Sequence, residues 1–139
     1  MSTVIRSELS KKNKYYISKH RYLELKHFCL QYYEWKNKYL EESCWASRGD
    51  IYNVGRKNGH FSDETTRIGV NLAQISHNIK IIEESCEEAD PYLASYIFKA
   101  VTEDRAYTYL KMVMEIPCGK DYYYSRYRKF FWILDKKRS

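Results

Sequence analysis

The chain has 139 residues, of which 44% are hydrophobic and 17% aromatic, and its formal net charge is +6. This apolar and aromatic content excludes an intrinsically disordered chain, and no stretch approaches the ~20 consecutive apolar residues of a membrane-spanning helix. Only two Pro and five Gly are present. We therefore predict an all-α protein of about four to five helices, with long N-terminal and central helices.

The positive charge is concentrated at the two ends of the chain. Residues 1–21 contain six Lys or Arg and one Glu, and residues 119–139 contain seven Lys or Arg and two Asp. Acidic residues gather between them, at Glu83, Glu84, Glu87, Glu88 and Asp90. Two basic ends around an acidic middle favour a polyanionic partner such as a nucleic acid.

The first predicted helix follows a basic N-terminal arm, residues 1–17, which we expect to be ordered only if Tyr15, Tyr16 and Ile17 dock on the rest of the protein. Ser18 is a suitable N-cap for a helix that runs to about residue 42. Its apolar residues recur every three or four positions, as one buried helical face requires. They are Leu25, Phe28, Cys29, Tyr32, Trp35 and Tyr39.

A loop is predicted next, at residues 43–61. The stretch SCWASRGDIYNVGRKNGHFS (43–62) is rich in Gly and Asn, and its apolar residues are isolated. The loop joins the two long helices into one region, residues 18–88.

The central helix is predicted to begin after Ser62, because Asp63 and Glu64 suit the positive end of a helix dipole. Apolar residues then step by four and three, which is a heptad pattern. They are Ile68, Leu72, Ile75, Ile79 and Ile82. The pattern fits packing inside the chain or a homodimer seam. Because coiled coils sustain at least three to four heptads, we favour packing inside the chain.

Residues 90–139 are predicted to form a helix-turn-helix module. Asp90-Pro91 resembles an N-cap followed by proline at the first helical position. A short helix reaches about Val101 and buries Leu93, Tyr96 or Ile97, and Ala100. A second short helix, YTYLKMVM, packs through Tyr109, Leu110 and Val113, and Ile116 is buried in the turn. EIPCG breaks the chain before a last helix that starts near Lys120.

The last helix has one aromatic face and one polar face. We expect its core face to be Tyr123, Tyr127, Phe130, Phe131 and Leu134. Opposite it we place Lys120, Asp121, Tyr124, Ser125 and Arg128. Of these, Lys120, Tyr124, Ser125 and Arg128 are the predicted contacts with DNA bases or phosphates. Lys136, Lys137 and Arg138 are expected to add an attraction that does not depend on sequence.

Two stretches carry a resemblance to a known group. YTYLKMVMEIPCGKDYYYSRYRKFFWILDKK and YYISKHRYLELKHFCLQYYEWKNKYLEE (15–42) are similar to small proteins encoded by phages and prophages of Firmicutes. Their ends resemble the helix-turn-helix in the fourth region of bacterial sigma factors. The resemblance implies a phage context and a DNA-binding C-terminal end. Many such motifs have Gly in the turn where this chain has Glu115.

Catalysis and cofactor binding have little support, so we predict a protein that is not an enzyme and binds no metal or other cofactor. The four His (His20, His27, His60 and His77) lie far apart, and the four Cys are scattered. No Gly-rich phosphate loop occurs. The first residues lack the apolar core of a signal peptide, so we expect reduced thiols in a cytoplasmic protein.

Two functions from different classes remain open. The first is a phage or prophage DNA-binding protein that regulates transcription by binding double-stranded DNA, for which a homodimer would match paired half-sites. A packaging component that binds the phage genome ends is a weaker variant of it. The alternative is a phage-encoded inhibitor of a host defence protein, similar in role to an anti-CRISPR protein, because Tyr-rich surfaces suit protein contacts. The position of exposed Tyr residues and Trp45 would separate the two.

Overall fold

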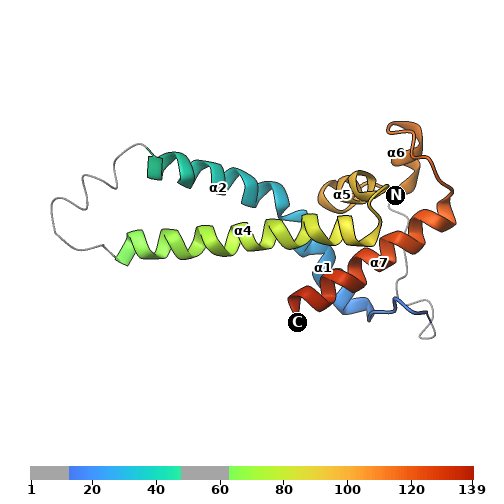
Figure 1. Cartoon of the computed structure of the whole chain (residues 1–139), viewed down its shortest axis with the longest axis horizontal. Helices are drawn as coiled ribbons and strands as arrows, with labels where there is room; N and C mark the ends of the chain where they lie inside the picture. The colour runs from blue at the N-terminus through green and yellow to red at the C-terminus, as the bar shows by residue number, and fades with distance from the viewer. Residues whose placement is uncertain (1–12, 48–62) are drawn as a thin grey trace. The chain divides into compact units, whose positions relative to one another are not determined.

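The computed structural model describes residues 13–47 and 63–139 of the chain. Within these ranges the chain forms helices and no strand, which confirms the all-α prediction. The helices are α1 (Lys19–Leu30), α2 (Tyr32–Ser47), α4 (Asp63–Ala89), α5 (Ala94–Glu103), α6 (Tyr107–Met112) and α7 (Lys120–Arg138) (Figure 1). Only Gln31 separates α1 from α2. If these two count as one interrupted helix, the described ranges hold five helices, which is within the expected number.

The described residues fall into two compact units. One contains residues 13–31 and 81–139, and the other contains residues 32–47 and 63–80. The predicted modules follow chain order, at 1–17, 18–88 and 90–139. In the structure, α1 instead belongs to the same unit as α5, α6 and α7, so residues 90–139 are only part of a compact unit.

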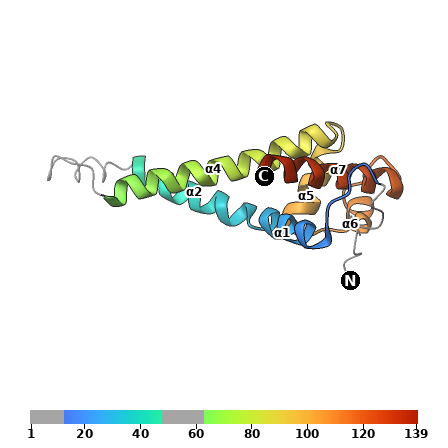
Figure 2. The ribbon, with the colours of Figure 1, turned by 90° about the horizontal axis from the view of Figure 1, so that it is seen from below.

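The unit of residues 32–80 is built from α2 and the first part of α4, which run alongside each other in opposite directions (Figures 1 and 2). α2 continues to Ser47, so residues 43–47 are helical and not part of a loop as predicted. SCWAS contains neither Gly nor Pro, and nothing local ends the helix before Gly49. The rest of the predicted loop, to residue 61, lies outside the described residues.

The predicted dimer seam is largely covered inside the chain. Ile75, Ile79 and Ile82 are buried, and Leu72 is half-buried. The side chain of Ile68 lies outside the described residues. The three buried isoleucines therefore fit packing within the chain, and they are not exposed to receive a second copy.

The first helix starts as predicted but is interrupted. The Ser18 hydroxyl accepts a hydrogen bond from the Arg21 amide at 3.3 Å. The backbone N–H of Gln31 donates a hydrogen bond to the carbonyl of Phe28, three residues earlier, at 3.3 Å. The side-chain amide of Gln31 donates a second one to the carbonyl of His27. A tightened turn of this kind ends α1 in place of the predicted continuous helix.

The end of the N-terminal arm packs against the rest of the unit, which is the condition under which we expected the arm to be ordered. Ile17 is buried, and the Tyr15 ring packs edge-on against Trp132 with ring centroids 5.3 Å apart. Residues 1–12 lie outside the described residues. The contact fixes residues 13–17 against α7.

In the unit of residues 13–31 and 81–139, α1 packs against both α5 and α7 to form the core. The predicted face of α7 is buried in full, at Tyr123, Tyr127, Phe130, Phe131 and Leu134. Tyr22 of α1 packs on Phe131 at 5.0 Å between ring centroids, and its hydroxyl is hydrogen-bonded to that of Tyr127 at 3.1 Å. At the rim of the core, Arg21 Nε lies 2.5 Å from Asp135 Oδ1.

α5 begins three residues later than predicted. Asp90 accepts hydrogen bonds from the amides of Tyr92 (2.9 Å) and Leu93 (3.3 Å), but it caps a turn at residues 91–93, and regular helix starts at Ala94. Pro91 therefore lies in that turn. Of the two residues left open for burial, Ile97 is the buried one and Tyr96 is half-buried.

The connection between α6 and α7 departs from a tight turn. Leu110 and Ile116 are buried as predicted, but Val113 is 61% exposed and does not pack inward. Seven residues, 113–119, separate the two helices, whereas a helix-turn-helix uses about three to four. The helix-turn-helix therefore stays a prediction.

Glu115 occupies a backbone conformation that favours glycine, with φ of 53°. A left-handed conformation costs a non-glycine residue about 1–2 kcal/mol. We expect Glu115→Gly to raise the free energy of unfolding by about 1 kcal/mol, after allowing for the greater freedom of glycine in the unfolded chain. Urea denaturation measures the change.

The matched control is Lys111→Gly, an exposed position inside α6. There the same replacement is expected to lower stability by about 1 kcal/mol. If both variants lost stability equally, the backbone at Glu115 would not be strained.

Candidate nucleic-acid interface

The outward face of α7 carries a basic and aromatic strip. Each residue of an α-helix is rotated by about 100° from the last, so side chains three and four positions apart share a face. On the side opposite the buried face, such positions hold Ser125, Arg128, Lys129, Trp132 and Lys136, and all five are exposed or half-buried. Docking of Tyr15 on Trp132 adds Lys14 and Tyr15 beside this face. We call these seven residues the α7 strip.

The structure corrects the predicted position of Tyr124. Its side chain is only 8% exposed, so it belongs to the buried stripe and cannot read DNA from the outer face. Around the helix axis, Tyr124 lies about 60° from the buried Tyr127 but about 100° from Ser125, so it is closer to the buried face. Lys120 is exposed at the start of α7, and its Nζ lies 5.9 Å from the centre of the Tyr124 ring.

Two of the three predicted C-terminal cations interact with acidic groups of the protein itself. Lys137 Nζ is 2.8 Å from a Glu88 carboxylate oxygen. Arg138 stacks on Phe28, 3.9 Å from the ring centre, and lies 3.8 Å from Glu24. Lys136, the third, points to the other side of α7 and joins the strip.

Among the described residues, no ion pair involves a cation of the strip, Arg128 and Lys129 included. Lys136 places its Nζ 3.4 Å above the centre of the Trp132 ring. Predicted residues that the structure brings together here are Ser125, Arg128 and Lys136.

Sequence reasoning missed Lys129, Trp132 and Tyr15. For Trp132 the signal was present, because it stands four residues after Arg128 and four before Lys136. Lys129 follows Ser125 by four. No local signal places Tyr15 beside Trp132, since that contact joins distant parts of the chain.

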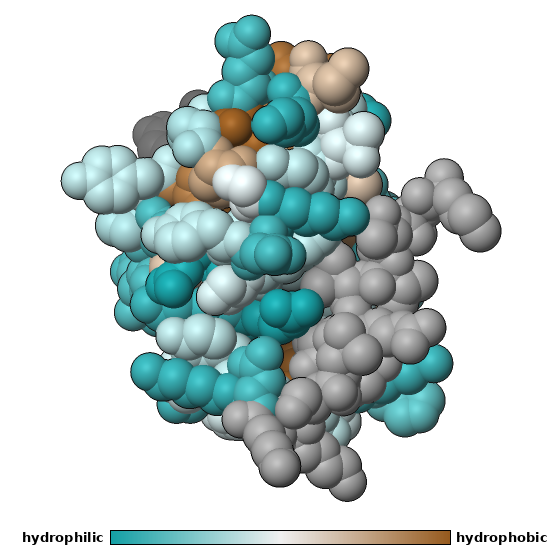
Figure 3. Space-filling model, turned by 90° about the vertical axis from the view of Figure 1, so that its right-hand side faces the viewer, coloured by the Kyte–Doolittle hydropathy of each residue, from teal (hydrophilic) through white to brown (hydrophobic). Residues whose placement is uncertain are grey.

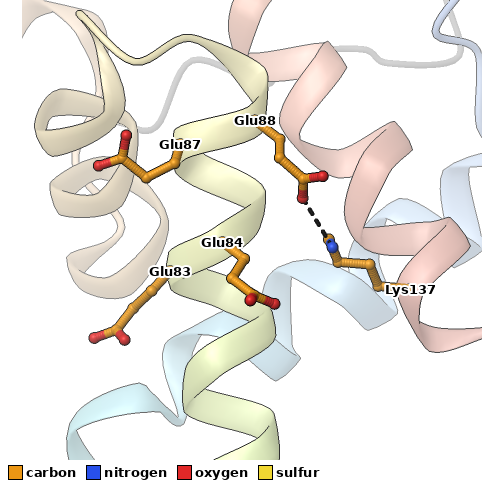
Figure 4. Close-up of a pocket in the computed structure, with 5 residues that line it drawn as sticks. All are labelled: Glu83, Glu84, Glu87, Glu88 and Lys137. Carbon is orange, nitrogen blue, oxygen red and sulfur yellow. Dashed lines mark ion pairs between the residues drawn. The ribbon is translucent and has the colours of Figure 1, made fainter.

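The acidic residues at the end of α4 lie beside one another along the helix. Glu83, Glu84, Glu87 and Glu88 line an open hollow together with Lys137. Figure 4 shows Glu88 and Lys137 pointing toward each other, while Glu83 and Glu87 project from another side of the helix. The four carboxylates therefore do not converge. No group of three or more potential metal ligands occurs among the residues described here.

The buried thiols do not suit nucleophilic chemistry. Burial raises the pKa of both Cys29 and Cys86 well above the usual range, so both remain protonated near neutral pH. Cys118 is half-buried, and its pKa is also raised, first by burial and then by Asp90. A reactive cysteine requires the opposite shift.

Large apolar and aromatic side chains outside the α7 strip are also exposed. They include Tyr92 (89%), Met112 (76%), Val113 and Tyr122. The face in Figure 3 is mostly hydrophilic, with a small hydrophobic area toward the top. Tyr122 donates a hydrogen bond to Asp90 at 2.9 Å, which raises the pKa of Tyr122, and Arg126 stacks on its ring. Asp90 thus joins the backbone at Tyr92 to the side chain of Tyr122. Trp45 has its side chain outside the described residues.

No protein-family model matches the chain, and no curated protein or solved structure matches it. In the part of the chain that can be described, none of the helices is both long enough and apolar enough to cross a membrane. The α7 strip and the surface around Tyr92 are therefore judged on their own chemistry.

Proposed function

We propose that the protein binds double-stranded DNA through the α7 strip and acts as a regulator of transcription in a phage or prophage. The observation that carries this proposal is the pair Arg128 and Lys129, half-buried cations without an acidic partner among the described residues. Unpaired cations on one helical face attract phosphates, and such contacts supply most of the affinity of a protein for DNA.

The dimensions of the strip suit several phosphates. Arg128 and Lys136 are eight residues apart on α7, which is about 12 Å along the helix. Successive phosphates of one strand advance by about 3.4 Å along the duplex axis. The strip can thus follow a short section of the DNA backbone.

The salt dependence of binding tests the proposal. For the wild-type protein and a random duplex, we expect the affinity to fall steeply between about 50 and 200 mM salt. In Arg128→Ala/Lys129→Ala, the slope of log K against log salt is expected to decrease by about two, since each lost phosphate contact changes it by ~0.9. Fluorescence anisotropy with labelled duplex gives both slopes.

The control variant Lys38→Ala/Lys80→Ala removes the same charge from exposed positions in the other unit. It should keep the wild-type slope. A weak or salt-independent affinity of the wild-type protein would reject DNA binding. If the two variants had equal salt slopes, the DNA interface would lie outside the α7 strip.

The surface around Tyr92 favours a second candidate, an inhibitor that binds a host defence protein. Exposed Tyr, Met and Arg side chains are the types enriched at protein interfaces. Asp90 holds the Tyr122 side chain and the backbone at Tyr92 in advance, which reduces the entropy lost on binding. Under this function, Tyr92→Ala should abolish binding to the host protein, whereas Arg128→Ala/Lys129→Ala should not affect it.

A further inference from the structure

We propose that Trp132 is a stacking site for an unpaired base, so that the α7 strip also binds single-stranded nucleic acid. This inference rests on the proposed contact between the strip and a nucleic-acid backbone. It adds a contact that an intact duplex cannot make, because the bases of a duplex are already stacked on one another.

The position of Trp132 suggests this role. Its half-buried ring lies midway along the strip, one helical turn from Arg128 on one side and from Lys136 on the other. The Tyr15 ring packs against it in an edge-to-face arrangement, with centroids 5.3 Å apart and planes inclined by 64°. Proteins that bind single strands combine such an aromatic ring with neighbouring cations. The cations bind phosphates, and the ring stacks a base.

In the free protein, the ring face is covered by Lys136, whose Nζ is 3.4 Å from the ring centre. Lys136 is exposed and stands on a flexible stem, so it can leave the ring without disturbing the helix. Attraction between an exposed cation and a ring is weaker than stacking of a base on an aromatic side chain. We therefore expect an incoming base to displace the ammonium group, which then pairs with a neighbouring phosphate.

The first test uses the wild-type protein alone. Its affinity is measured for an oligothymidine strand and for an abasic strand of the same length, which has the same phosphates but no bases. If a base stacks on Trp132, the oligothymidine should bind about 5- to 150-fold more tightly, the range that stacking of one base supplies. Equal affinities with a steep salt slope would overturn the stacking site and leave backbone binding intact. Binding to neither strand and to no duplex would overturn both proposals.

The second test assigns the effect to Trp132. Trp132→Ala should remove the preference for oligothymidine over the abasic strand, and Trp132→Phe should keep most of it. Tyr92→Ala is the matched control, because it removes an aromatic side chain that is 89% exposed and lies outside the strip. Circular dichroism checks that each variant is folded. A preference that persists in folded Trp132→Ala would place the stacked base elsewhere and reject the assignment.

Discussion

Replacing Phe131 by alanine is expected to lower the free energy of unfolding by about 3–5 kcal/mol. Phe131 is fully buried where α1 meets α7, and its ring contacts those of Tyr22, Tyr127 and Phe130 at centroid distances of 4.9–5.0 Å. Alanine would leave a cavity among rings that cannot all move to fill it. Because the stability of a typical domain is only ~5–15 kcal/mol, this unit would be close to unfolding.

Urea denaturation followed by circular dichroism measures the loss. Lys129→Ala, two residues earlier on the outer face of the same helix, should change stability by less than about 0.5 kcal/mol. Phe131→Leu keeps most of the volume and should lose less than alanine does. A loss below about 1 kcal/mol for Phe131→Ala would mean that the aromatic cluster is not the centre of this core.

Replacing Asp90 by alanine is expected to cost about 2–3 kcal/mol. One carboxylate oxygen accepts from the amides of Tyr92 and Leu93, and the other accepts from the Tyr122 hydroxyl. Loss of a cap costs about 1 kcal/mol. The hydrogen bond from Tyr122 adds to this loss, but less than a buried bond would, because the hydroxyl of half-exposed Tyr122 can turn to water.

Two further variants separate the contributions to this loss. Asp90→Asn retains an oxygen that can accept the amide bonds, so it should lose less than alanine. Tyr122→Phe removes only the hydroxyl bond, which solvent screens, and should lose less stability than Asp90→Ala. If Asp90→Ala and Tyr122→Phe lost the same amount, the two amide bonds would contribute nothing and the capping role of Asp90 would be rejected.

Local signals predicted much of the fold correctly. The helix starts at Ser18 and Lys120 were predicted from the residues immediately around them. The aromatic face of α7 was predicted from helical periodicity alone. Errors arose where the outcome depends on distant segments. Periodicity gives the centre of a buried face but not its width, which decides that Tyr124 is covered. Whether Val113 packs inward likewise depends on what lies against it.

In the candidate site, too, the features set by spacing along the helix were predicted, whereas those set by contacts with distant segments were not. Ser125 and Arg128 were placed on the outer face of the last helix from spacing. Lys137 and Arg138 also looked like free cations in the sequence, but their partners, Glu88 and Glu24, come from helices far away in the chain. Charge along a sequence predicts a basic region, whereas the pairing of individual charges requires the tertiary structure.

The packing of α1 against α7 also constrains the order of folding. About 90 residues separate these helices in sequence, so the ring contacts between them close a very long loop. Contacts of high sequence separation form late and slow the folding of a domain. During synthesis, α1 can pack against α5 first, but its apolar side stays only partly covered until α7 has left the ribosome. The intervening helix α2 and the first part of α4, which form a unit of their own, can form before then.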